Sequence, residues 1–176
     1  MRAPDHDDTD ARLVNRIAEG DHAALVDLYG RHAAWILVRL RRRCAVEELV
    51  DNALQDTFVS AWRSAPDYRV ERGAVGAWLW TIAVRRLVDQ LRRRAPPTPV
   101  DNVPDTVELP PPGTPADELL AGLAPDLQGV VEAVYLDGLT VNEAALLLGI
   151  PAGTVKSRLS RARTELTRTE WKGVPR

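Results

Sequence analysis

Cations and small hydroxyl side chains gather on one face of a predicted helix over residues 155–166. Apolar residues recur there at spacings of 4, 3 and 4, which is typical of the inward stripe of an α-helix. The outward side then carries Lys156, Ser157, Arg158, Ser160, Arg161 and Thr164. Long cations reach phosphates or guanine, and small hydroxyl groups bond to base edges or to the nucleic-acid backbone. We interpret this face as a DNA-contacting surface, since a merely solvated face would more often mix acids and bases.

A turn and another predicted helix precede that face. Thr140 and Glu143 have the three-residue spacing of a capping box. Gly149 suits the left-handed end of that helix, and Thr154 suits the start of the next one. Helix, tight turn and helix at this length predict a helix-turn-helix with residues 155–166 as its recognition helix.

A second group of candidate contacts combines aromatic and arginine side chains. At roughly 100° per residue, Trp78 lies on the same side of a predicted helix as Arg85, opposite the apolar Leu87. An aromatic ring stacks on an unpaired base while arginines hold phosphates. The candidate contacts to nucleic acid here are Tyr68, Arg69, Arg72, Trp78, Arg85, Arg86, Arg92 and Arg93. The alternative is that Trp78 and Trp80 are simply core anchors.

Helices must position these residues, because apolar residues recur at helical spacing along most of the chain. A short helix is predicted around Leu13, a longer one from the N-cap Asp21, and a third from Val46. A fourth covers about 74–94, and two further helices are separated near Pro125. No alternating run of β-branched and aromatic residues predicts a strand, so the expected fold class is all-α.

A proline-rich segment divides the chain into two modules. Residues 95–116 contain eight prolines, which remove backbone donors and forbid a continued helix. We therefore predict two small helical domains, residues 1–94 and 117–176, joined by a Pro-rich acidic linker at 95–116.

Charge is also separated along the chain. Residues 12–94 carry a net +5 and residues 140–176 a net +4, whereas residues 95–139 carry −8. Two basic modules joined by an acidic segment indicate two contacts with a polyanion. Solvated helix faces without a partner are the alternative on charge alone.

The composition offers little for metal, redox or membrane chemistry. The single cysteine, Cys44, cannot form an internal disulfide, and the three histidines lack zinc-ligand spacing, so no metal or cofactor is expected. No run approaches the roughly 18 apolar residues that a membrane span needs. The N-terminus has acids where a secretion signal would be apolar, so we expect a cytoplasmic protein.

Three segments together resemble a known family. The segment GLTVNEAALLLGIPAGTVKSRLSRARTEL is similar to the promoter-recognising end of an ECF-type (extracytoplasmic function) bacterial RNA polymerase sigma factor of the sigma-70 family. LVDNALQDTFVSAWR resembles the polymerase-binding helix of that family, and GAWLWTIAVRRLVDQLRRR resembles its helix for the upstream promoter-melting element. The resemblance runs from about Asp10 to Arg168, with the segments in the family's order.

The resemblance implies a sigma-2-like domain, a sigma-4-like domain and a role for each candidate residue. It implies that Asp51, Gln55 and Asp56 contact core RNA polymerase. It also implies that the aromatic and arginine group contacts the -10 element, and that the outward face of residues 156–164 reads the -35 element. The implied partners are core RNA polymerase, promoter DNA and an anti-sigma factor that covers both modules. The chain departs from the family pattern at Asn52, Val84, Arg85, Val141 and Asn142.

Two other classes of protein compete with this interpretation. A helix-turn-helix regulator that binds an operator as a dimer explains residues 140–166, but it leaves LQDTFVSAW and the Trp/Arg helix without a purpose. An enzyme acting on nucleic acid needs clustered metal-binding carboxylates or a nucleophile with a base, and the acids here are scattered. We therefore expect a protein that is not an enzyme.

Overall fold

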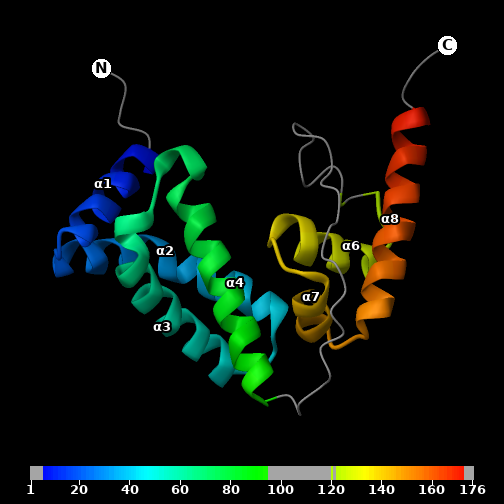
Figure 1. Ribbon diagram of the computed structural model, residues 1–176, viewed down its shortest axis with the longest axis horizontal. Helices are drawn as coiled ribbons and strands as arrows, with labels where there is room; N and C mark the ends of the chain where they lie inside the picture. The colour runs from blue at the N-terminus through cyan, green and yellow to red at the C-terminus, as the bar shows by residue number, and fades with distance from the viewer. Residues whose placement is uncertain (1–5, 95–119, 121, 173–176) are drawn as a thin grey trace. The chain divides into compact units, whose positions relative to one another are not determined.

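The computed structural model describes residues 6–94, 120 and 122–172; the side chains of residues 6–8, 72 and 167–172 lie outside that description. The chain forms two compact units, Met1–Arg94 and Ala95–Arg176 (Figure 1). Every regular element in the described part is helical, which confirms the all-α expectation. The predicted linker, residues 95–116, lies outside the described residues.

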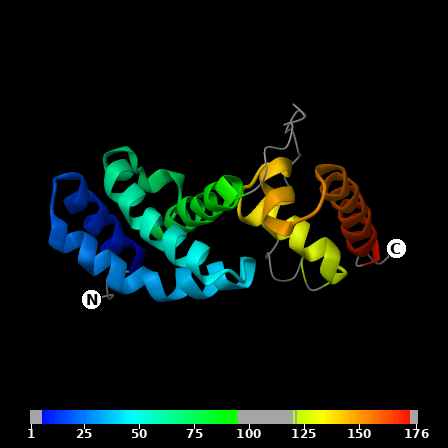
Figure 2. The ribbon, with the colours of Figure 1, turned by 90° about the horizontal axis from the view of Figure 1, so that it is seen from below.

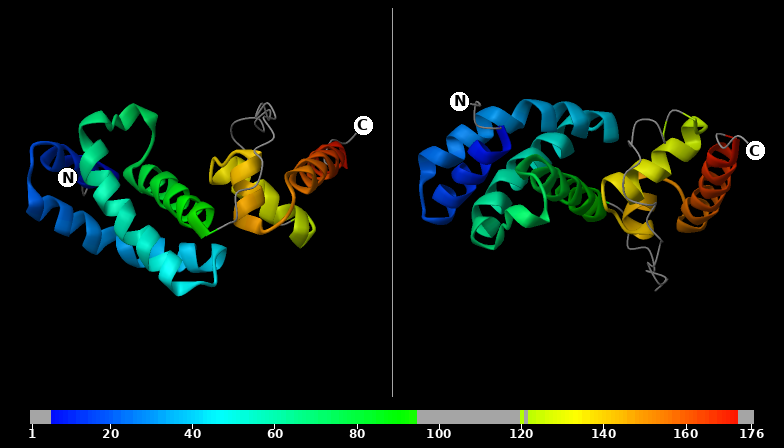
Figure 3. Two further views of the ribbon diagram at one scale, coloured as in Figure 1. Left: turned by 60° about the horizontal axis from the view of Figure 1, so that its bottom comes forward. Right: turned by 90° about the horizontal axis from the view of Figure 1, so that it is seen from above.

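The N-terminal unit consists of four long helices and two short 3-10 turns. They are α1 (His6–Ala18), α2 (His22–Arg43), α3 (Glu47–Ser64), η1 (Ala65–Asp67), η2 (Val70–Arg72) and α4 (Val75–Arg94). Figures 1 and 3 show α3 and α4 running side by side, connected by the loop that holds the two 3-10 turns. This pair of helices therefore positions the residues of the predicted aromatic and arginine group.

The core of this unit follows the predicted helical periodicity. Buried side chains of α3 and α4 include Leu49, Val50, Ala53, Phe58, Leu79, Ala83, Val84 and Leu87. Asp21 caps α2 as expected, because its Oδ1 accepts hydrogen bonds from the backbone N–H groups of Ala23 and Ala24. The third helix was predicted from Val46, with Val46 as the first residue of its apolar stripe. That position was wrong, because Val46 is the N-cap residue of α3 and is 43% exposed.

A buried polar network ties α1 to α2. The Asp10 carboxylate lies 2.7 Å from Arg31 Nη1 through one oxygen and 2.7 Å from His32 Nε2 through the other. The indole Nε1 of Trp35 donates to His32 Nδ1 at 3.0 Å, so that ring nitrogen carries no proton. The other ring nitrogen, Nε2, is therefore the one that donates to Asp10.

The C-terminal unit is a smaller helical cluster. Among its described residues, the elements are α6 (Pro125–Val131), the π-helical turn η3 (Glu132–Leu136), α7 (Val141–Leu148) and α8 (Ala152–Lys172), and Figure 2 shows them from below. Buried residues from each helix meet in one core: Leu127, Val130, Val141, Ala144, Leu147, Val155, Leu159 and Ala162. The inward stripe predicted for the last helix is confirmed at Val155, Leu159 and Ala162, whereas its fourth position, Leu166, is half-buried.

The turn between α7 and α8 largely matches its prediction. The capping box is formed, with Glu143 N donating to Thr140 Oγ1 at 3.2 Å and Thr140 N donating to Glu143 Oε2 at 2.9 Å. Gly149 ends α7 at φ +65°, in the left-handed region. The predicted start of the next helix was wrong: α8 begins at Ala152, because the backbone N–H of Thr154 already bonds back to the carbonyl of Pro151.

The described residues provide neither a membrane span nor a metal site. None of the helices there is long and apolar enough to cross a membrane. No group of three or more His, Cys, Asp or Glu side chains in that part of the chain is placed to hold a metal ion.

Candidate nucleic-acid interface

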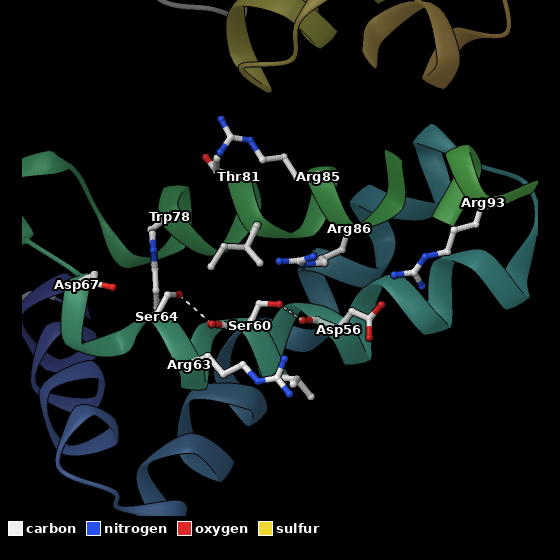
Figure 4. A pocket seen from close by; sticks show the side chains of 12 residues that line it. Asp56, Ser60, Arg63, Ser64, Asp67, Trp78, Thr81, Arg85, Arg86 and Arg93 are labelled. Atoms are coloured by element: carbon white, nitrogen blue, oxygen red, sulfur yellow. Dashed lines mark hydrogen bonds between the residues drawn. The ribbon is translucent and has the colours of Figure 1, made fainter. Parts of the chain in front are cut away.

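A cleft of about 520 Å³ lies between α3 and α4 (Figure 4). Its lining is mixed, with one large aromatic ring, four arginines and two aspartates among polar and aliphatic side chains: Asp56, Val59, Ser60, Arg63, Ser64, Asp67, Trp78, Thr81, Ile82, Arg85, Arg86 and Arg93. Four guanidinium groups against two carboxylates leave the lining with a positive balance. Such a cleft attracts an anionic ligand with a flat apolar part, as a nucleotide has.

Trp78 stands between this cleft and a smaller one. The smaller cleft has a volume of about 230 Å³ and is also lined by Tyr68, Arg69 and Thr81. The rings of Tyr68 and Trp78 lie 5.0 Å apart at an interplanar angle of 49°. Trp78 is only half-buried, whereas Trp80 is 4% exposed and belongs to the core. The core-anchor alternative therefore describes Trp80 but not Trp78.

The loop before α4 is held in place by hydrogen bonds to its own backbone. Tyr68 donates its hydroxyl to the carbonyl of Gly73 at 2.9 Å. Arg69 Nη1 donates to the carbonyls of Pro66 and Tyr68, both at 2.8 Å. These bonds fix the aromatic ring beside Trp78. The side chain of Arg72 lies outside the described residues.

The arginines predicted on α4 separate into two groups. Arg85, Arg86 and Arg93 line the larger cleft, and in Figure 4 Arg86 and Arg93 extend from α4 toward α3. Arg86 also pairs with Asp89 at 3.1 Å. Arg92 lines neither of the two clefts described here and lies 3.9 Å from the other carboxylate oxygen of Asp89.

Sequence reasoning missed Arg63, which lines the cleft from α3. It lies seven residues after Asp56 on the same helical stripe as Ser60, so its spacing carried the necessary signal. Of that stripe, the family resemblance assigns a role only to Asp56, as a polymerase contact. The hydroxyls of Ser60 and Ser64 bond back to carbonyls one turn earlier, at 2.6 and 2.8 Å.

The predicted polymerase contacts on α3 do not share one environment. Asp51 and Gln55 are exposed and lie one turn apart. Asp56 is half-buried and points toward α4, where its Oδ2 accepts a hydrogen bond from Gln90 Nε2 at 2.8 Å. The structure therefore places Asp56 at the cleft as well as beside the exposed face.

The outward face of α8 presents the predicted DNA contacts. Lys156, Ser157, Ser160, Arg161 and Thr164 are exposed and Arg158 is half-buried. Ser157 and Thr164 donate to backbone carbonyls one turn earlier, at 3.0 and 3.1 Å. Their oxygens still accept hydrogen bonds from a ligand, because a hydroxyl has two lone pairs.

Comparison with known proteins finds two separate family matches in the chain. Residues 28–96 match Sigma-70 region 2, and residues 115–166 match Sigma-70, region 4. ECF RNA polymerase sigma factor SigM of Mycobacterium tuberculosis is 34% identical over 168 residues, which cover 93% of this chain and 85% of SigM. ECF RNA polymerase sigma-E factor of Haemophilus influenzae is 31% identical, with 88% of this chain and 92% of the relative covered. Among solved structures, CnrH in complex with the cytosolic domain of CnrY is 25% identical and covers 94% of this chain and 99% of that one, with a TM-score of 0.45.

The fold, the arginine-lined cleft between α3 and α4 and the basic face of α8 are those of an all-helical protein with a helix-turn-helix unit. The region matches and the 34% identity to SigM show more than that: the chain belongs to the ECF RNA polymerase sigma factors of the sigma-70 family. Sigma factors are transcription initiation factors that bind core RNA polymerase and direct it to promoter DNA. The region 2 match covers α3 and α4, so a lone operator-binding regulator is not favoured.

Proposed function

We propose that the two units divide the work of promoter recognition. In this division residues 1–94 bind core polymerase and open the -10 element, residues 95–116 form a linker, and residues 117–176 read the -35 element. The observation that carries the proposal is the cleft between α3 and α4, which Trp78, Arg86 and Arg93 of α4 line together within the region 2 match.

At the -10 element the cleft would hold an unpaired base. Moving a base out of the duplex stack costs a few kcal/mol, which contacts in a pocket offset. The Trp78 ring supplies a stacking surface, and the arginines on both sides supply charge for the neighbouring phosphates. The loop bonds of Tyr68 and Arg69 hold this arrangement ready before DNA binds.

At the -35 element α8 would enter the major groove. Its exposed hydroxyls allow the helix to approach base edges, and Lys156 and Arg161 reach guanine or phosphate. A good bidentate pair discriminates by about 1–3 kcal/mol against the wrong base. The net charge of residues 140–176 is only +4, so this unit alone would bind DNA weakly. When polymerase holds both units, the second DNA contact becomes effectively intramolecular, which raises the apparent affinity for a promoter that carries both elements.

Regulation and location follow from the same proposal. The family resemblance implies an anti-sigma factor that covers both units and holds the protein inactive. The proposed site of action is the cytoplasm, where polymerase and promoter DNA are. The proposal assigns the chain no catalytic step of its own, since RNA synthesis belongs to the polymerase.

Trp78→Ala tests the role of the cleft in promoter opening. With reconstituted holoenzyme, we expect promoter opening to weaken by about tenfold, since base stacking is worth about 1–3 kcal/mol by alanine substitution. Opening is measured by the fluorescence of 2-aminopurine placed in the -10 element. Trp62→Ala is the matched control, because Trp62 is also half-buried but stacks on His22 and lines neither cleft described here.

A second pair of variants tests the division of labour. Arg161→Ala and Ser157→Ala should change selection at the -35 element and leave polymerase binding intact. If these variants lost polymerase binding while remaining folded, the assignment of α8 to DNA would be wrong.

A further inference from the structure

One carboxylate lies beside two of the arginines on the proposed DNA-reading face. Asp126 Oδ2 is 3.5 Å from Arg158 Nε and 3.9 Å from Arg161 Nη1. Asp126 belongs to α6, whereas both arginines belong to α8, so this contact joins two elements of the C-terminal unit. Neither the sequence pattern nor the family resemblance assigns a role to this residue.

The backbone at Asp126 is held in place by the core beneath it. The next residue, Leu127, and Val130 one turn on are fully buried, as is Val155 on α8. The position of Asp126 relative to the first turns of α8 is therefore set by packing. The backbone of α6 therefore places the Asp126 carboxylate on the α6 side of the recognition helix, beside both guanidinium groups.

This contact contributes little to the stability of the folded unit. The side chains of Asp126 and Arg161 are 40% and 63% exposed, and that of Arg158 is 30% exposed. Ion pairs at such exposure contribute little to folding because water and salt screen them. Their effect on a charged ligand is larger, because a phosphate approaching α8 meets the same three charges.

We infer that Asp126 is a positioning residue for -35 reading, which holds Arg158 and Arg161 in place and offsets part of their charge. This inference rests on the proposed function of α8. Cations bound only by charge settle on phosphates and bind all sequences alike, whereas cations held in fixed positions discriminate among base edges. Asp126 thus lowers non-specific affinity and raises selectivity.

The test is Asp126→Asn in the full chain, assembled with core polymerase on promoters that carry a matched or a scrambled -35 element. We expect affinity for the scrambled promoter to rise and the ratio of matched to scrambled affinity to fall, each by about two- to tenfold, which is the lower part of the range of coupling between residues in contact. The salt dependence of binding should also steepen, because one more net positive charge faces the phosphates. Asp27→Asn, an exposed carboxylate on α2, makes the same change in net charge and should alter none of these values.

A double-mutant cycle separates positioning from a general charge effect. In a background that already carries Arg158→Ala and Arg161→Ala, Asp126→Asn should have no further effect on the affinity ratio. An unchanged ratio in Asp126→Asn alone, or the same change in both backgrounds, would overturn the inference. If the unmodified chain itself gave no preference for the matched -35 element, the proposed function of α8 would fail, and the inference with it. Thermal unfolding of each variant shows that the unit remains folded.

Discussion

At the scale of single residues, the interactions that the sequence could not predict are those between distant positions. Capping of α2 by Asp21 and the capping box at Thr140 follow from local spacing and were predicted. The pairing of Asp10 with His32 spans 22 positions and depends on how α1 packs against α2, so no local pattern indicates it. The contact of Asp126 could not be predicted for the same reason, because its partners lie on another helix.

Asp10→Ala should destabilise the N-terminal unit. The substitution removes the acceptor of the buried His32 Nε2–H and the partner of Arg31. We expect a loss of about 1–3 kcal/mol in the free energy of unfolding, which is the usual cost of leaving a buried polar group unsatisfied. Urea unfolding followed by tryptophan fluorescence measures it. Asp27→Ala, at an exposed position, should stay within about 0.5 kcal/mol of the parent, and an equal loss there would refute the role of the network.

Asp21 gives a prediction for pH dependence. Hydrogen bonds from the Arg16 side chain, joined by those from the backbone of Ala24 and Ala23, lower the pKa of Asp21 below its ordinary value of 3.8. Because the folded state favours the ionised form, the stabilisation is complete well above pH 3.8 and is lost as the pH falls through the lower pKa of the folded state.

Asp21→Asn keeps a capping side chain but removes the charge. The variant should therefore be less stable than the parent at pH 7, and the difference should shrink as the pH approaches 3. Unfolding curves at several pH values test this, and a difference that grew toward low pH would contradict the assignment.

At the scale of elements, helices that carry a clear apolar stripe were predicted with their type and approximate bounds. The errors fall at element ends, where side-chain pattern says least. Val46 proved to be a cap rather than part of the stripe, and α8 begins two residues before the predicted Thr154. The π-helical turn η3 and the cleft between α3 and α4 could not be predicted, since both depend on how neighbouring elements pack.

Two glycines near the helix-turn-helix provide a matched pair of substitutions. Gly149 has a φ of +65°, where a side chain is strained, whereas Gly153 lies in the first turn of α8 with nothing within 4 Å of the position that a Cβ would take. Gly149→Ala should cost about 1 kcal/mol, and Gly153→Ala should be neutral or stabilise by up to about 1 kcal/mol. Thermal unfolding of the two variants compares them, and equal effects would mean that the left-handed turn is not formed.

At the scale of the whole molecule, the proposed function depends on two surfaces that act on one polymerase and one promoter. The resemblance of three ordered segments to sigma factors predicted the family, which the region matches confirm. Family membership alone does not assign a role to each residue. Asp56, for example, contacts α4 as well as bordering the proposed polymerase face.

Gln55→Ala combined with Asp56→Ala should weaken binding to core polymerase by at least about fivefold, or about 1 kcal/mol. The DNA preference of α8 should be unaffected. Gln90→Ala is the control, because it removes the hydrogen bond from Gln90 on α4 to Asp56 on α3 and leaves both proposed contacts in place. Binding is measured by fluorescence anisotropy of the labelled chain. A loss as large in Gln90→Ala would assign the effect to the helix pair rather than to polymerase contact.

The most direct test of the central claim is run-off transcription from a library of random -35 and -10 sequences, with bacterial core polymerase in the presence and absence of this protein. Recognition by two units predicts transcripts that appear only with the protein and whose templates share two motifs at a fixed spacing. No added transcription from a competent core and a folded protein would contradict the claim, and templates that share a single motif would contradict the division between the two units.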